Sequence, residues 1–134
     1  MTDATYGYTK NLGAIGFDEA IERVTAALKG EGFGVLTDID VKATLKKKLD
    51  VDFRQYRILG ACNPPLAHQA LSGEPLIGLL LPCNVVVLEE DDGTITVSLA
   101  NPRELFKVVQ NESLLAMAGE VDDKIRRVAD ALGN

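Results

Sequence analysis

Two cysteine–asparagine pairs and the only histidine of the chain are the side chains best suited to chemistry. Cys62 and Asn63 stand in "GACNPPLAHQAL", which also contains His68, and Cys83 and Asn84 stand in "LLLPCNVVVL". Thiols and an imidazole act as nucleophiles, bases and soft-metal ligands, and asparagine amides donate and accept hydrogen bonds. These five residues are therefore the candidate binding residues.

The surrounding pattern predicts how the two cysteines come together. Residues 55–62 are typical of a strand that ends at Cys62, and another β-rich run begins at Cys83. If these strands are antiparallel neighbours, the end of one lies beside the start of the other. A short helix beginning at Pro64–Pro65 would cover the same place and bring His68 to the two thiols.

Three kinds of site fit such a cluster. A thiol redox site would use Cys62 as the nucleophile, Cys83 as its resolving partner and His68 as the base. A soft-metal site would use both thiolates and the imidazole, but it needs a fourth ligand and lacks CxxC or HxxxH spacing. A pocket for a small molecule or an anion would use the amides of Asn63 and Asn84.

Each of these residues also has a purely structural interpretation. Free cysteine is often buried as a small apolar residue. Asn63 directly precedes a proline and is a good helix N-cap, and His68 fits an ordinary helix position. Asn84 lies in a β-rich run where asparagine is disfavoured, which predicts a bulge or an edge strand. The sequence leaves open whether these residues form a site and whether the protein is an enzyme.

Length, composition and charge narrow the class of protein. The chain has 134 residues, 46% of them hydrophobic, which predicts a single domain over residues 1–134. It has only two cysteines and no basic start followed by an apolar run, so we expect a reduced, cytoplasmic protein. The net charge of −6 argues against nucleic acid as a partner, and the Pro- and Gly-interrupted apolar run 75–88 argues against a membrane.

Hydrophobic periodicity and turn residues predict elements in the order β-α-β-α-β-α-β-β-α-α. We expect Asp18 and Asp40 to cap the helices that follow them. The segment 75–81 is ambiguous between a short helix and an irregular apolar stretch. Strands are expected at residues 5–12, 33–39, 55–62 and on both sides of Asp92–Gly93, and helices at 18–30, 41–49, 64–71, 102–109 and 112–132.

The clearest local signal is the hairpin turn at Asp92–Gly93. In the strand that follows it, Ile95, Val97 and Leu99 should face the core, whereas Thr94, Thr96 and Ser98 should face water. The helices have apolar stripes, which include Val41, Leu45 and Leu49 in one and Leu115, Ala118 and Val121 in another. The sequence thus predicts an α+β fold, a two-layer sandwich of a mostly antiparallel sheet with helices packed on one face.

Three stretches of the chain carry a family resemblance. "EGFGVLTDIDVKATLKKKLDVDF", "YRILGACNPPLAHQAL" and "EPLIGLLLPCNVVVLEEDDGTITVSLANP" resemble the domain of unknown function 302 family, from about Tyr8 to Leu132. The resemblance implies a TATA-binding-protein-like α+β fold that is often a homodimer, and it implies no established activity. It also implies that both Cys-Asn pairs and the histidine belong to one site: Cys62, Asn63, His68, Cys83 and Asn84.

These observations together predict a homodimeric binding module for a small anionic ligand or a metal near Cys62, His68 and Cys83. The apolar "GLLLP" stretch and the strand at residues 94–99 support dimerisation, because one small sheet does not easily hide so much apolar surface. Two alternatives stay open. One is a thiol-dependent enzyme or redox sensor using both cysteines, and the other is a structural or interaction protein with core cysteines. The sequence identifies no cofactor.

Overall fold

The protein has one five-stranded sheet in a computed structural model that describes residues 4–133. Neighbouring strands lie in the order β1-β5-β4-β3-β2, and every pair is antiparallel. The antiparallel sheet expected from the sequence is therefore confirmed. The strands are β1 (Gly7–Asn11), β2 (Gly34–Asp40), β3 (Tyr56–Cys62), β4 (Cys83–Glu89) and β5 (Ile95–Ala100).

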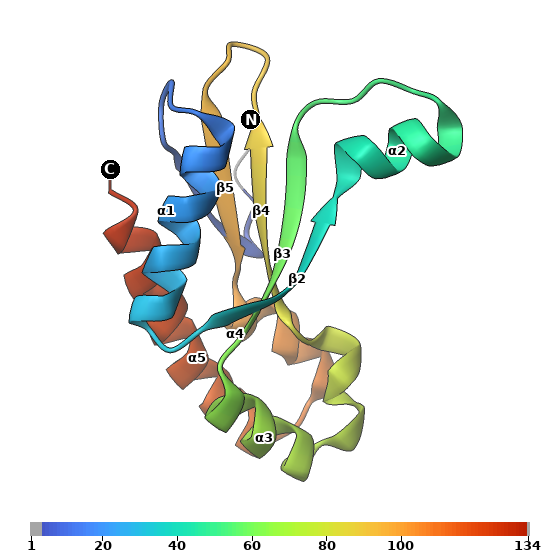
Figure 1. Cartoon of the computed structure of the whole chain (residues 1–134). Helices are drawn as coiled ribbons and strands as arrows, with labels where there is room; N and C mark the ends of the chain where they lie inside the picture. Colours follow the sequence, from blue (N-terminus) through green and yellow to red (C-terminus); the bar gives the residue numbers. More distant parts are fainter. Residues whose placement is uncertain (1–3, 134) are drawn as a thin grey trace.

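Two long helices lie side by side on one face of the sheet (Figure 1). These are α1 and α5, whereas α2 projects from the end of β2, and α3 lies beyond the end of the sheet (Figure 1). None of the helices within residues 4–133 combines the length and the apolar character needed to cross a membrane. The helices are α1 (Phe17–Gly30), α2 (Val41–Leu49), α3 (Pro64–Gly73), α4 (Pro102–Leu105) and α5 (Glu112–Ala131), with 3-10 turns η1 (Pro75–Leu80) and η2 (Phe106–Val109).

The main core fills the space between the sheet and the helices α1 and α5. Ile95, Val97 and Leu99 are fully buried there, as their alternation predicts. The prediction that Thr96 faces water is wrong, because it is only 3% exposed. Its hydroxyl donates to Glu90 Oε2 at 2.6 Å, so the polar group is satisfied where it is buried.

The helix starts follow the predicted caps in one case and not in the other. Asp40 caps α2, since its Oδ1 accepts a hydrogen bond from the Ala43 N–H at 2.9 Å. Asp18 does not cap α1, because Gly16 is the N-cap residue and makes no side-chain cap bond. Asp18 lies in the first turn instead, where its carboxylate interacts favourably with the positive end of the helix dipole.

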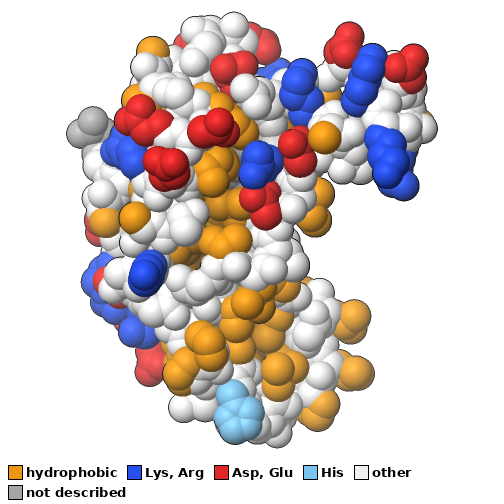
Figure 2. Space-filling view, in the orientation of Figure 1, with side chains coloured by type: hydrophobic (Ala, Val, Ile, Leu, Met, Phe, Trp, Pro, Cys, Tyr) orange, Lys and Arg blue, Asp and Glu red, His pale blue; other side chains and the backbone are white. Residues whose placement is uncertain are grey.

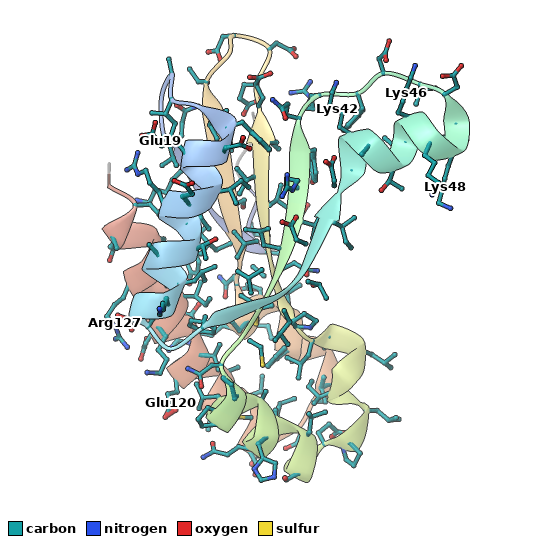
Figure 3. The ribbon with its side chains drawn as sticks, in the orientation of Figure 1. Glu19, Lys42, Lys46, Lys48, Glu120 and Arg127 are labelled. Carbon is teal, nitrogen blue, oxygen red and sulfur yellow. The ribbon has the colours of Figure 1, made fainter. Side chains whose placement is uncertain are left out.

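Helix α2 belongs to a projecting arm, which we define as residues 36–53. None of the residues of α2 is buried, and Leu49 is 66% exposed although it lies on the predicted apolar stripe. The labelled side chains of Lys42, Lys46 and Lys48 lie along this arm, away from the rest of the chain (Figure 3). Val41 and Leu45, the other two members of the predicted stripe, are partly buried, so no element within residues 4–133 covers this face completely.

Helix α5 also departs from its predicted stripe at one end. Leu114 is 3% exposed and packs inward, whereas the predicted Leu115 is 37% exposed. Two other segments differ in detail from the expected elements. The helix expected at 102–109 is divided into α4 and the 3-10 turn η2, and the ambiguous segment 75–81 forms the 3-10 turn η1.

Candidate functional site

The pairing of β3 with β4 brings the two cysteines to the same end of the sheet. Ala61 pairs with Cys83 and Gly60 with Asn84, so Cys62 lies one residue beyond the partner of Cys83. This confirms the predicted chain reversal. Gly60 is required at this place, because a Cβ there would lie 2.7 Å from Pro82 Cγ and would also meet the Thr37 side chain.

A cleft of about 230 Å³ opens at this end of the sheet, and both cysteines line it. Its walls come from the sheet end, α3, η1, η2 and α5. Apolar side chains gather over this lower part of the molecule, whereas most charged ones lie above it (Figure 2). The lining residues are Phe33, Leu36, Ala61, Cys62, Asn63, Leu66, Ala67, Ala70, Leu71, Gly78, Leu81, Pro82, Cys83, Phe106, Met117 and Val121.

The cleft separates two hydrophobic clusters. The main core contributes Phe33 and Cys83 to its walls, and a smaller cluster around α3, η1 and η2 contributes Ala70 and Phe106. Met117 is partly buried and packs against both clusters. We call the smaller cluster and its elements, residues 64–82 and 106–118, the foot of the molecule. The cleft is thus an unfilled seam between the core and the foot.

Asn63 lies in the cleft wall and serves as the cap of α3. Its Oδ1 accepts from the Leu66 N–H at 3.4 Å, and its Nδ2 donates to the Glu31 carbonyl at 3.4 Å. The predicted N-cap is therefore confirmed. Backbone groups thus bind both the oxygen and the nitrogen of the side-chain amide. Asn63 therefore has a structural role at the edge of the cleft.

His68 does not join the thiols. Leu66 and Ala70 face inward from α3, and His68, two residues from each, is exposed and does not line the cleft. The pale blue histidine lies at the lower surface of the molecule (Figure 2). The prediction that the imidazole converges with the two thiols is therefore wrong, because the helix rotates this position outward.

Asn84 faces a different depression. It lies in the central strand β4 opposite Gly60, in regular register, so the bulge or edge strand predicted for it is wrong. Its exposed side chain lies with Val86 and Ser98 on the sheet face that α1 and α5 leave uncovered. An exposed amide is tolerated there because water satisfies it.

The two cysteines differ in their surroundings. Cys83 is 8% exposed, and Cys62 is half-buried. Burial raises the pKa of Cys83 to about 11, and the nearby Cys62 raises it further in the same direction. At neutral pH Cys83 is a neutral thiol. Within residues 4–133 no group of three or more His, Cys, Asp or Glu side chains is placed to hold a metal ion.

A buried polar network that the sequence does not reveal lies on the other side of α5. Asp122 is completely buried, and it accepts hydrogen bonds from Tyr8 Oη at 2.5 Å and from Arg103 Nη1 at 2.6 Å. Burial, followed by the hydrogen bond to Asp122, raises the pKa of Tyr8 to about 12. Three distant segments meet here, so no local motif predicts the contact.

The fold and the cleft define a small α+β domain with helices on one face of its sheet and an apolar opening at the sheet end. Residues 8–132 match the model of the family described as "Domain of unknown function DUF302". The chain belongs to this family, which confirms the resemblance seen in the sequence.

Two relatives are also similar to the chain. A crystal structure of an uncharacterized conserved DUF302 protein from Bacillus stearothermophilus is 33% identical, covers 97% of this chain and 100% of its own, and superimposes with a TM-score of 0.87. An uncharacterized protein of Aquifex aeolicus (strain VF5) is 27% identical over 100 residues, which are 75% of this chain. The match spans 63% of that relative's length. Neither name states an activity.

Proposed function

We propose that the protein is a homodimeric binding module whose small-molecule ligand occupies the cleft beside Cys62 and Cys83. The observation that carries the proposal is the cavity of about 230 Å³ between two hydrophobic clusters. Protein interiors are close-packed, and voids larger than a water molecule are few. An apolar concavity at the junction of several elements is the usual form of a ligand site, and this cleft lies just below the common range of about 300–1,000 Å³, which favours a small ligand.

The lining favours an uncharged ligand over the anion or metal expected from the sequence. Among the residues that the structure describes, none that lines the cleft carries a charge, and Asn63 is the only amide in its wall. Burying an anion without a cation or free donors is costly. Two thiols without the imidazole also fall short of the ligand set that a structural metal site requires.

Native mass spectrometry of the purified protein tests this proposal. We expect a bound small molecule in the wild-type protein and its loss in Ala67→Leu, because the added side chain enters the cleft from α3. Ala26→Leu, at an exposed position of α1, is the matched control and should keep the ligand. Two negative results together would contradict the proposal. These are a wild-type protein that carries no small molecule, and a screen in which Ala67→Leu weakens the binding of no compound.

The foot supports the homodimeric part of the proposal. Leu76 is 73% exposed and Leu79 is 85% exposed, within a run from Pro75 to Cys83 that contains no charged residue. Figure 2 shows apolar side chains protruding from this side of the molecule. A second copy related by a two-fold axis can cover this patch with the same patch, because such an interface is self-complementary.

Sedimentation velocity at micromolar concentration tests the dimer. We expect a dimer for the wild-type protein and a monomer for Leu79→Lys, which places a charge in the centre of the apolar patch. Leu49→Lys is the matched control, since Leu49 is also exposed but lies on the arm, and it should remain dimeric. A monomeric wild-type protein would exclude this part of the proposal.

A thiol-dependent reaction is the second candidate function, because both thiols line one cleft and Cys62 contributes to the raised pKa of Cys83. In this case a low-molecular-weight disulfide would oxidise Cys62 and Cys83 to an internal disulfide and would itself be reduced to two thiols. Mass spectrometry after such treatment would show the loss of two hydrogens from the protein. Intact thiols or separate mixed disulfides would exclude this function.

A further inference from the structure

The geometry points to the way in which two copies meet: we infer that Leu76 and Leu79 of each copy lie in a groove on the open sheet face of the other, beside Asn84. This inference rests on the homodimer of the proposed function and makes its interface specific. It is carried by an apolar ridge and a groove that adjoin on one face, by the absence of charge from both, and by the position of Asn84.

The groove lies on the face of the sheet that α1 and α5 leave uncovered (Figure 1), and its volume is about 370 Å³. We call it the open-face groove. Three neighbouring strands form its floor, and residues 79–82 form one wall. Gly7 keeps the floor low, because a Cβ there would lie 2.7 Å from Ser98 Oγ. The floor residues are Asn84 and Val86 on β4, Ser98 and Ala100 on β5, and Gly7 on β1.

Leu76 and Leu79 form the ridge, on the 3-10 turn η1. Residues three apart lie on the same side of a 3-10 helix, so these two exposed side chains stand in line. Ile77, between them in the sequence, is buried in the foot, and Leu80 packs against the same cluster. The turn is therefore anchored by one side and presents the two leucines on the other.

The ridge and the open-face groove adjoin, since Leu79 is also a wall residue of the groove. A protruding element beside a hollow on the same face is what a two-fold interface requires, because each copy then supplies both parts. One rotation places the ridge of each copy over the groove of the other. A second copy thus covers both exposed leucines and fills both grooves at once.

The distribution of charge favours a second copy as the occupant. The chain has a net charge of −6, so two copies repel each other wherever their charged surfaces approach. Among the described residues, none that lines the open-face groove is charged, and the run 75–88 contains no charged residue. Two identical acidic chains therefore approach most easily through this face, whereas a charged partner would find no counter-charge in it.

Asn84 supplies a polar contact for this interface. Asparagine is disfavoured in strands, yet Asn84 stands in the central strand β4 with its side chain exposed in the groove floor. Its amide both donates and accepts hydrogen bonds. The last carbonyl groups of a helical turn lack partners within the turn, and the end of the entering η1 brings such groups to the Asn84 amide. This contact would fix the register of the two copies.

Sedimentation equilibrium of two charge variants and of their mixture tests the inference. Leu79→Glu and Asn84→Lys each place two unpaired charges in the interface, and each alone should raise the dissociation constant of the dimer by at least about 100-fold. In an equimolar mixture, one half of the interface keeps Leu79 against Asn84, and in the other half the introduced carboxylate faces the introduced ammonium group. The mixed dimer should therefore form with a dissociation constant within about tenfold of the wild-type value.

Ala26→Lys is the matched control for the added charge. Ala26 is exposed on α1, on the covered side of the sheet, so this variant should dimerise like the wild-type protein.

Disulfide trapping provides the test if a charge variant does not fold. Leu79→Cys and Asn84→Cys proteins are mixed and treated with oxidised glutathione, which takes up the two electrons and two protons and becomes two molecules of glutathione. We expect a disulfide between position 79 of one chain and position 84 of the other, assigned by peptide mass mapping. Leu49→Cys in place of Leu79→Cys should give no such link, because Leu49 lies on the arm.

The outcomes separate this inference from the proposed homodimer. If the wild-type protein is a dimer but Asn84→Lys leaves it intact, or if neither mixture pairs positions 79 and 84, the contact between ridge and groove is excluded while the homodimer stands. A wild-type protein that is monomeric at micromolar concentration would exclude both.

Discussion

Helix α5 meets the rest of the protein in two contrasting ways at adjacent residues. Asp122 is completely buried, and its carboxylate is bonded to Tyr8 and Arg103. Val121, one residue earlier, is also buried but lines the open cleft. We call the contact around Asp122, where the polar groups are satisfied, the closed seam. We call the apolar cleft that Val121 lines the open seam.

The difference shows where the chain alone completes its structure and where it does not. A buried carboxylate is costly unless it is paired, so the closed seam works only because three segments supply its partners. The open seam contains no polar groups that need partners, and its walls lose only dispersion contacts while it is empty. An apolar ligand can supply those contacts. Variants in the two seams should therefore differ in their effect on stability.

The largest effect is expected in the closed seam. Arg103→Ala leaves the Asp122 carboxylate buried without its cation, which should lower the free energy of unfolding by about 3 kcal/mol. The matched control is Arg127→Ala, which breaks the exposed ion pair to Glu31 near the end of α1 (Figure 3) and should cost less than about 1 kcal/mol. Guanidinium denaturation measures the free energy of unfolding of both variants. Equal losses would contradict the difference expected between the buried and the exposed ion pair.

The second effect is a pH dependence at the open seam. Because Cys83 keeps its proton in the folded state up to a pKa of about 11, whereas the ordinary thiol value is 9.0, stability is full below pH 9 and falls as the pH rises towards 11. The loss should be at most about 2.7 kcal/mol, the equivalent of two pKa units.

Urea denaturation between pH 8 and 11 measures this loss. Cys83→Ala should remove most of this fall in the free energy of unfolding. Deprotonation of Tyr8 should lower the free energy of unfolding only above pH 10, since the pKa of Tyr8 is raised to about 12. A Cys83→Ala variant with an unchanged pH profile would show that this thiol is not buried at the cleft.

A smaller effect of opposite sign is expected from filling the open seam. In ligand-free protein, Ala67→Leu should raise the free energy of unfolding by about 1 kcal/mol, the usual gain from filling a cavity. Ala26→Leu on the surface of α1 should change it by less than about 0.5 kcal/mol. A clear destabilisation by Ala67→Leu would mean that the cleft is already packed in solution.

The smallest effect is expected on the arm. Leu49→Ala should change the stability of the isolated chain by less than about 0.5 kcal/mol, because this side chain is 66% exposed and buries little area. The corresponding change at Leu28, which is fully buried in α1, should cost about 2–5 kcal/mol. Thermal unfolding of the two variants compares them, and a large loss at Leu49 would indicate that the arm is covered in solution.

The elements that the sequence predicts well are those determined by local residues. The Asp92–Gly93 turn and the alternation of Ile95, Val97 and Leu99 predict the β5 strand, and Asn63 and Asp40 cap the expected helices. Local patterns do not identify the partner of a helix face. For this reason the predicted stripe of α2 is only partly covered, and Leu49 at its end is 66% exposed.

The candidate site was predicted in part for the same reason. The chain reversal between β3 and β4 follows from strand order and brings Cys62 and Cys83 to one cleft. His68 was misplaced because one residue of helical phase decides which way a side chain points. Phe33 and Met117 reach the cleft only through the packing of distant elements, which no local signal in the sequence encodes.

A crystal structure of the protein as it is purified tests the central claim most directly. We predict density for a small uncharged molecule in the cleft, in contact with Cys83 on the core side and Phe106 on the foot side. A cleft closed by its own side chains, or a molecule bound only outside it, would contradict the account.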